Sequence, residues 1–261
     1  MRETVEIITV NLEAVDTGDV SVRGQAFRIL LPSPAGSRSR GGSKEDDVRV
    51  AAIVVAGLFI AGGATAQTGG RSWNFDGDKA GSPPAGFHFA RTGSGAQGRW
   101  VVKADGGAPS GANVLAQLDQ DDTDNRFPVA VVDGVKVKDV RVSVRCKAVS
   151  GKVDEACGLV FRYIDENNYY VTRANALEDN VRLYKVEKGS RRQLASWSGK
   201  VTPETWHTLA AEAKGDNLEV SWNGRKIMEA KDATFGQAGA IGVWTKADSV
   251  TYFDDLTVSG Q

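Results

Sequence analysis

Hydrophobic and polar residues alternate in short runs along most of the chain after residue 70. In "VKDVRVSVRC", Val140, Val142 and Val144 are separated by charged or hydroxyl side chains, which is the period-two pattern of a strand with one buried face. The stretch "NLEVSWNG" (217–224) repeats the pattern. Gly, Asp, Asn or Pro bounds nearly every run, and a turn near "DATFGQA" (232–238) is the one sign of helix. The pattern predicts an all-β fold.

The spacing of the runs predicts an antiparallel two-sheet sandwich or a barrel, since many short strands are separated by turn residues. The expected strands are 71–75, 86–90, 99–104, 113–118, 127–132, 137–149, 158–164, 169–176, 181–187, 191–197, 205–214, 217–223, 225–230, 239–245 and 250–258.

One apolar run breaks the alternation. "VRVAAIVVAGLFIAGGATAQ" begins at Val48, and its uncharged part, 50–63, is about 14 residues long, whereas a membrane-spanning helix needs roughly 20. Arg49 precedes the run and Ala64-Thr65-Ala66 follows it, as in a secretory signal peptide. We expect a signal peptide over 48–66, cleaved after Ala66. An uncleaved anchor through 50–63 is the alternative.

The segment ahead of this run has a composition typical of disorder, and we expect it to be a disordered or mis-called N-terminal extension. Residues 1–47 hold one aromatic residue, Phe27, and the polar stretch "PSPAGSRSRGGSKEDD". A start near Val48, or a cytoplasmic tail on an anchored protein, would each account for them. The expected organisation is an extension (1–47), a signal peptide (48–66) and one domain (67–261).

The charge balance after residue 66 excludes partners that need a strong field. Basic and acidic residues are equal in number there, so neither nucleic acid nor an anionic membrane is expected to bind, and no membrane insertion is expected once the signal is removed. All 6 Trp and all 5 Tyr also lie after residue 66. The domain is therefore large enough, and aromatic enough, to hold a core.

The chain has 2 cysteines, Cys146 and Cys157, placed symmetrically about Gly151-Lys152. Two strands folding back at that point would bring them opposite each other, where a cross-strand disulfide is geometrically allowed. Two buried free thiols are the alternative. A zinc site is excluded, because the 2 histidines, His88 and His207, lack ligand spacing with the cysteines.

Three motifs resemble one family. They are "GLVFRYIDENNYY" (G-x-x-x-R-Y-x-D-x-x-N-Y-Y), "WHTL" and the closing "FDDLTV". Together the chain from 75 to 258 resembles concanavalin A-like (LamG-like) jelly-roll domains of the secreted bacterial 3-keto-disaccharide hydrolase, or family-16-glycoside-hydrolase-like, group. The resemblance implies a jelly-roll sandwich, a glycan or glycoside ligand, and a secreted or periplasmic location.

The residues give little support to catalysis. The central insertion of larger relatives and the E-x-D-x-x-E strand of laminarinase-type enzymes are both missing. The acidic pairs Asp165-Glu166 and Glu178-Asp179 are adjacent in sequence and lie in turns, so their side chains are expected to diverge. In "TWHTL", His207 is expected on the polar face of a strand, with no nucleophile near it.

Polar and aromatic residues on several strands suit a sugar ligand, through ring stacking and hydrogen bonds to hydroxyls. In "YYVTRAN", Tyr169, Val171, Arg173 and Asn175 are expected on one face. The alternative is that the aromatic rings are core and the arginines pair with acidic neighbours. The predicted ligand-binding residues are Arg162, Arg173, Asn175, Arg182, Tyr184, Trp244, Lys246 and Asp248.

Jelly-roll relatives often hold a structural calcium ion where the first and last strands meet. The resemblance therefore implies Ca²⁺ at Asp76 and Asp254, with Asp78 and Asp255 behind them. Solvent-facing Asp residues in turns are the alternative. The function expected from the sequence is an exported carbohydrate- or glycoside-binding jelly roll without an evident catalytic site. The alternative function is a glycoside hydrolase or lyase of the 3-keto-disaccharide type.

Overall fold

The computed structural model describes residues 4–14, 20–30 and 68–260. The chain divides into two units, 1–60 and 61–261, which are described separately. In the first unit, β1 (Thr4–Ala14) and β2 (Val20–Leu30) pair as an antiparallel hairpin, in register from Thr4↔Leu30 to Ala14↔Val20. The expectation that 1–47 is a disordered or mis-called extension stays a prediction. The predicted signal peptide, 48–66, and its cleavage point lie outside the described residues.

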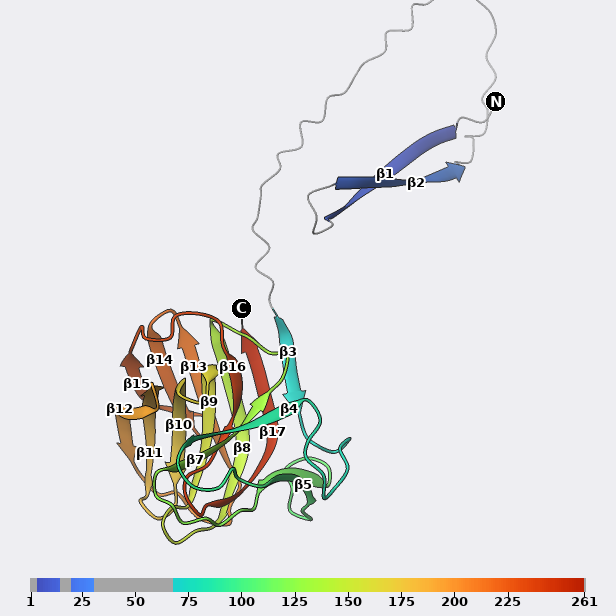
Figure 1. Ribbon diagram of the computed structural model, residues 1–261. Helices are drawn as coiled ribbons and strands as arrows, with labels where there is room; N and C mark the ends of the chain where they lie inside the picture. The colour runs from blue at the N-terminus through green and yellow to red at the C-terminus, as the bar shows by residue number, and fades with distance from the viewer. Residues whose placement is uncertain (1–3, 15–19, 31–67, 261) are drawn as a thin grey trace, which may run out of the picture. The chain divides into compact units, whose positions relative to one another are not determined.

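The second unit is built of strands alone within the part of the chain that is described (Figure 1). Each strand expected from residue 71 onward has a counterpart. The strands are β3 (Thr68–Trp73), β4 (Phe87–Gly93), β5 (Trp100–Ala104), β6 (Asn113–Gln117), β7 (Arg126–Val132), β8 (Val140–Ser150), β9 (Ala156–Asp165), β10 (Asn168–Asn175), β11 (Asn180–Glu187), β12 (Ser190–Ser198), β13 (His207–Lys214), β14 (Asn217–Trp222), β15 (Arg225–Lys231), β16 (Ala240–Trp244) and β17 (Val250–Gly260). Among the described residues no helix is long and apolar enough to cross a membrane.

The strands form two antiparallel sheets that pack as a sandwich. The seven-stranded sheet has the order β12-β11-β10-β9-β16-β7-β4. The eight-stranded sheet has the order β15-β14-β13-β8-β17-β6-β5, with β3 paired to β17. Strands distant in sequence are neighbours in both sheets, as where β16 lies between β9 and β7 (Figure 1).

The main core lies between the sheets and follows the predicted alternation. Val140, Val142 and Val144 of β8 face inward, opposite Leu159 and Phe161 of β9. All five side chains are at most 2% exposed. Fully burying such side chains stabilises the fold by about 1.5–3 kcal/mol each.

A second apolar cluster covers the outer face of the seven-stranded sheet. Its largest ring is Trp244 of β16, which is 0% exposed and stacks on Phe127 of β7 with 5.4 Å between ring centroids. Gly158 of β9 makes room for this ring, since a Cβ there would lie 2.9 Å from Trp244 Cε3. The outer face of this sheet is therefore packed with side chains rather than bare.

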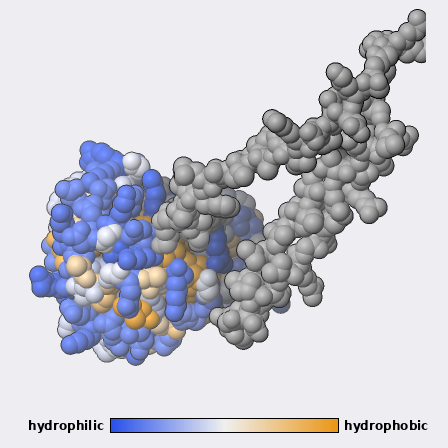
Figure 2. Space-filling view, turned by 90° about the horizontal axis from the view of Figure 1, so that it is seen from above, coloured by the Kyte–Doolittle hydropathy of each residue, from blue (hydrophilic) through white to orange (hydrophobic). Residues whose placement is uncertain are grey.

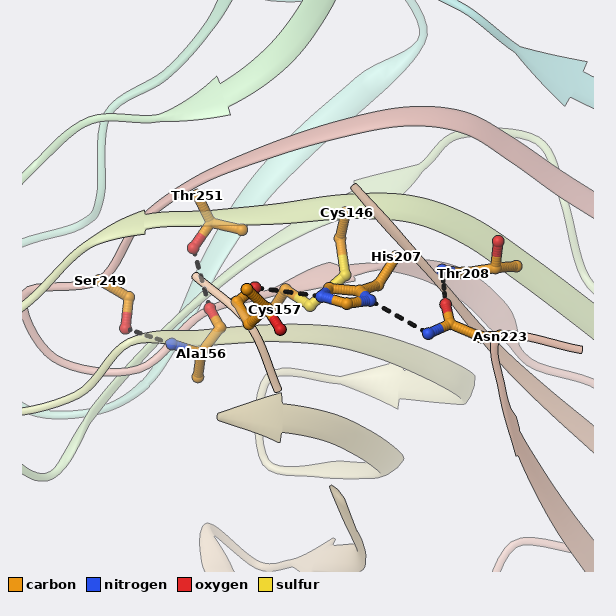
Figure 3. The surroundings of a disulfide bond; sticks show 9 residues. Cys146, Ala156, Cys157, His207, Thr208, Asn223, Ser249 and Thr251 are labelled. Atoms are coloured by element: carbon orange, nitrogen blue, oxygen red, sulfur yellow. Dashed lines mark hydrogen bonds between the residues drawn. A yellow bond between two sulfur atoms is a disulfide. The ribbon is translucent and has the colours of Figure 1, made fainter. Parts of the chain in front are cut away.

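The two cysteines form a disulfide with 6.2 Å between their Cα atoms (Figure 3). The predicted pairing is confirmed, but the predicted cross-strand hairpin is wrong. Cys146 lies on β8 in the eight-stranded sheet and Cys157 on β9 in the seven-stranded sheet. The loop 151–155 therefore carries the chain from one sheet to the other, and the disulfide ties the two sheets together through the core.

His207 lies beside the disulfide, opposite Cys146 in the register of β13 and β8. Its ring stacks on Trp222 with 4.6 Å between centroids. Nδ1 lies 3.1 Å from the Asn223 amide nitrogen and Nε2 lies 3.0 Å from the Thr202 carbonyl oxygen, so the ring accepts at Nδ1 and donates at Nε2 (Figure 3). The expectation that His207 faces outward is wrong, because it shares the inward face with Leu209.

Candidate functional site

The outer face of the seven-stranded sheet gathers most of the predicted ligand-binding residues. Tyr169 and Val171 of β10 belong to its apolar cluster, so Arg173 and Asn175 share that face, as the alternation predicted. The arginine and the asparagine are 2% and 1% exposed. Both residues therefore need partners within the protein.

The partners of Arg173 come from the turn between β10 and β11 and from β11 itself. Its Nη2 donates to Glu178 Oε2 at 2.8 Å and lies 3.4 Å from the Tyr184 hydroxyl. Its Nη1 donates to Asn180 Oδ1. Arg182 approaches the same Glu178 oxygen at 3.5 Å. One carboxylate thus holds two guanidinium groups at the end of the sheet.

Glu178 is held in place yet open to solvent. Its side chain is 40% exposed, and Oε2 also accepts from Asn180 Nδ2 at 3.0 Å. Partial burial alone would raise the pKa of Glu178, but the Asn180 hydrogen bond and the charges of Arg173 and Arg182 outweigh it, so the pKa lies below its usual value. The carboxylate is therefore charged at neutral pH and presented at the surface.

A second polar cluster, around Asp154, lies beside the first. Asp154 Oδ1 accepts from Asn175 Nδ2 at 2.8 Å, and Oδ2 pairs with Lys246 Nζ at 2.9 Å. Lys246 also reaches Asp124 at 2.5 Å. The Asp154 side chain is 1% exposed, and burial raises its pKa despite these partners. Asp154 is thus enclosed, unlike Glu178.

The sheet curves strongly at this site. The Arg191 guanidinium carbon, reaching from the edge strand β12, lies 4.6 Å from the ring centroids of both Tyr184 and Phe127. Tyr184 is on β11 and Phe127 on β7, which β10, β9 and β16 separate in the sheet. In a flat sheet these strands would be about 19 Å apart. The sheet is therefore concave on this side.

Two of the predicted residues do not present side chains to this face. Arg162, at a left-handed position of β9 with φ 45°, is 0% exposed and donates to the carbonyl oxygens of Lys138 at 2.8 Å and Phe235 at 3.0 Å. Asp248 accepts the backbone N–H groups of Lys152, at 2.7 Å, and of the next two residues. Arg162 therefore anchors loops, and Asp248 holds the connection between the sheets.

The predicted calcium ligands meet at one loop. Asp76 Oδ1 accepts from the backbone N–H groups of Ala112 and Asn113 at 2.8 and 3.0 Å. Asp254 Oδ2 accepts from Ser110 N at 3.0 Å. Within residues 70–260 no group of three or more His, Cys, Asp or Glu side chains is arranged to hold a metal ion. In the described structure, backbone N–H groups donate to the carboxylates of Asp76 and Asp254. The calcium site stays a prediction.

Sequence reasoning did not select four members of the face: Asp154, Glu178, Asn180 and Arg191. The sequence spacing indicates one contact of Glu178, because Arg182 follows it by four residues. In the structure Arg182 approaches the Glu178 carboxylate. Its neighbour Asp179 turns away to the Val201 N–H at 3.0 Å, as expected for adjacent residues. Asn180 lies opposite Asn175 in the hairpin of β10 and β11, whereas Asp154 and Arg191 are brought in by topology, which no local spacing indicates.

The charged and amide side chains of this face can form hydrogen bonds and ion pairs with a ligand. A retaining glycosidase needs two carboxyl groups about 5–5.5 Å apart that both reach the substrate. Asn175 and Lys246 occupy the two oxygens of Asp154, whose side chain is 1% exposed. The other acidic pair, Asp165-Glu166, is used in a turn, where Asp165 accepts from Asn167 N at 2.8 Å. Glu178, by contrast, has a side chain that is 40% exposed.

Comparison with known proteins shows the fold. No family model matches the chain. Carbohydrate-binding module CBM66 from Bacillus subtilis superimposes with a TM-score of 0.54 and 20% identity, over 67% of this chain and 96% of that one. The GH43 protein BlXynB from Bacillus licheniformis superimposes with a TM-score of 0.50 and 16% identity, over 73% of this chain and 39% of that one. The second unit therefore has the two-sheet jelly-roll fold found in carbohydrate-binding modules.

One curated relative matches in sequence. Levanase of Bacillus subtilis (strain 168) is 28% identical over 95 residues, which is 36% of this chain and 13% of the levanase. The chain thus corresponds to a small part of that protein. The narrower resemblance to the 3-keto-disaccharide hydrolase group stays a prediction, since no family model matches.

Proposed function

We propose that this chain is an exported carbohydrate-binding domain whose ligand lies on the concave face of the seven-stranded sheet, beside Glu178. The observation that carries the proposal is the state of this carboxylate. It is charged, oriented by Arg173 and Asn180, and 40% exposed. A fixed carboxylate can accept hydrogen bonds from two neighbouring sugar hydroxyls, and charge-assisted bonds of this kind are the stronger ones.

The surroundings of Glu178 suit a sugar ring. Arg182 is 34% exposed and adds donors, while Leu177, in the same turn, is 51% exposed and offers an apolar surface. Sugars present both hydroxyls and C–H faces, so a site that combines polar groups with apolar contact fits them. The fold likeness to CBM66 and the levanase match support the same ligand class.

Export is part of the proposal. The signal-like segment 48–66 and the disulfide Cys146–Cys157 support it, because disulfides persist in oxidising compartments. N-terminal sequencing of the native protein tests the cleavage after Ala66. A first residue of Gln67 supports export, and a retained Met1 contradicts a cleaved signal.

A glycan array tests the binding function, with the wild-type chain, Glu178→Gln and the matched control Glu212→Gln. Glu212 lies on β13 of the eight-stranded sheet with a side chain 48% exposed. Loss of a charge-assisted hydrogen bond should weaken binding by about ten- to a hundredfold in Glu178→Gln. Glu212→Gln should bind like the wild type.

Two results would contradict the proposal: binding of no glycan, or equal loss in both variants. A parallel hydrolysis screen on 3-keto-glucosides tests the alternative enzyme. Cleavage that disappears in Glu178→Gln would establish a hydrolase or lyase instead of a binding domain.

A further inference from the structure

Three arginines converge on the ring of Tyr184. The Arg191 guanidinium carbon lies 4.6 Å from the ring centroid, and that of Arg173 lies 5.9 Å from it. Arg182 is two residues from Tyr184 on the same strand. A hydrogen bond with the Tyr184 hydroxyl is the main cause that raises the pKa of Arg182, and the charge of Glu178 adds to it. Positive charge is thus gathered at one place on the concave face.

Two of these arginines share one acidic partner among the described residues. Glu178 pairs with Arg173 at 2.8 Å and with Arg182 at 3.5 Å. Arg191 takes part in no ion pair within the described chain, and its contacts are with aromatic rings. Lys246, at the neighbouring cluster, pairs with two aspartates of its own. Three guanidinium groups therefore lie around Tyr184, and Glu178 forms ion pairs with two of them.

Each of these arginines also keeps a donor without an acceptor. The Nε atoms of Arg173 and Arg182 and the Nη1 atom of Arg191 are buried, and none has a hydrogen-bond partner in the described part of the chain. Arg173 is 2% exposed, so its Nε lies away from bulk solvent. A buried donor without a partner is destabilising, and a cation held on aromatic rings gains no hydrogen bond from them.

We propose that this site selects acidic glycans, and that Arg191 is the residue that recognises the acidic group. The inference rests on the proposed function and narrows its ligand class. A uronate or sulfate group would supply the missing counter-charge at Arg191, which takes part in no ion pair within the described chain. The planar guanidinium, held against Tyr184 and Phe127 from the edge strand β12, presents its N–H groups at its rim, where a carboxylate or sulfate binds.

The test is an array that carries neutral, uronate-bearing and sulfated glycans in equal numbers, probed at low salt and at 0.5 M NaCl. The proteins are the wild type, Arg191→Gln, Arg191→Lys and the control Arg192→Gln. Arg192 is the next residue on β12, it is exposed, and it points away from the face. A thermal melt of each variant checks that it is folded.

We expect acidic glycans to bind at least about tenfold more tightly than neutral ones, and high salt to weaken that binding. Arg191→Gln should remove the preference, Arg191→Lys should keep part of it, and Arg192→Gln should keep all of it. The uronate and sulfate arms show which acidic group is bound.

Preferential binding of neutral glycans, or an acidic preference unchanged in Arg191→Gln, would overturn the inference while leaving the binding function intact. If Arg191→Gln does not fold, the comparison of acidic with neutral glycans on the wild type still decides whether the site prefers acidic glycans. Absence of binding to every glycan would overturn the proposed function as well, so the two failures are distinguishable.

Discussion

The disulfide between the sheets should contribute measurably to stability. Cys146 and Cys157 are separated by 11 positions and join strands of different sheets. Closing a loop of this length removes chain entropy from the unfolded state worth about 3 kcal/mol at 25 °C. For a domain of this size, each kcal/mol corresponds to about 2–4 °C in the melting midpoint. Reduction should therefore lower the midpoint by about 6–12 °C.

The perturbation is reduction of the wild-type chain in denaturant, followed by refolding with the reductant present. This route is needed because both sulfur-bearing side chains are at most 2% exposed in the folded protein. Near-ultraviolet circular dichroism follows the melt, with the oxidised chain carried through the same denaturant and refolding steps as the control. The double variant Cys146→Ala/Cys157→Ala should melt no higher than the reduced chain, since it also loses buried atoms.

Coincident midpoints of the oxidised and reduced chains would refute the reasoning. That result would mean that the core alone holds the two sheets together, and that the disulfide does not lower the conformational entropy of the unfolded chain. A midpoint lowered by reduction, with no further loss on refolding at higher reductant, is the result we expect.

Three further predictions concern packing, pH and metal. Gly158→Ala should lower the melting midpoint by an amount corresponding to about 1–3 kcal/mol, because a Cβ there would lie 2.9 Å from Cε3 of the Trp244 indole. Gly106→Ala is the control and should leave the midpoint unchanged, because a Cβ there would meet open space. The pKa of Glu178 is lowered on folding, so its stabilising contribution is present above its unfolded value of 4.5 and is lost as the pH falls through the lower folded value. Acid titration of the melting midpoint should therefore be shallower below pH 4.5 in Glu178→Gln than in the wild type; parallel profiles would contradict this. If calcium joins the first and last strands, EDTA should lower the midpoint and added Ca²⁺ should restore it, and an unchanged midpoint argues against the ion.

Strand positions could be predicted from the sequence because side-chain alternation is a local property. Val140, Val142 and Val144 show their buried face without knowledge of any partner strand. Pairing is different. A loop as short as 151–155 suggests a hairpin, yet here it crosses between sheets, because β8 pairs with β13 and β17 while β9 pairs with β10 and β16.

The candidate face could be predicted in part for the same reason. Arg173 and Asn175 can be predicted to share a face, because they occupy alternate positions on one strand. Arg162 was misplaced because the backbone at that position is left-handed, with φ 45°, which interrupts the alternation. Arg191 could not be found, because its contact with Phe127 depends on the curvature of a sheet whose strand order the sequence does not reveal.

The described surface can be compared with the surfaces of proteins that bind other proteins through hydrophobic patches. In the view of Figure 2 the described surface is mostly hydrophilic, with smaller hydrophobic areas. Large exposed apolar patches are what mark many protein–protein interfaces.

Hydrogen–deuterium exchange, with and without the best glycan from the array, tests most directly where the ligand lies. Binding on the concave face should slow exchange in the turn 176–179 and in β11 (Asn180–Glu187), which carry Glu178, Arg182 and Tyr184. Strands β13 and β14 of the eight-stranded sheet should exchange unchanged. Protection confined to the eight-stranded sheet, with none around Glu178, would contradict the assignment of the site.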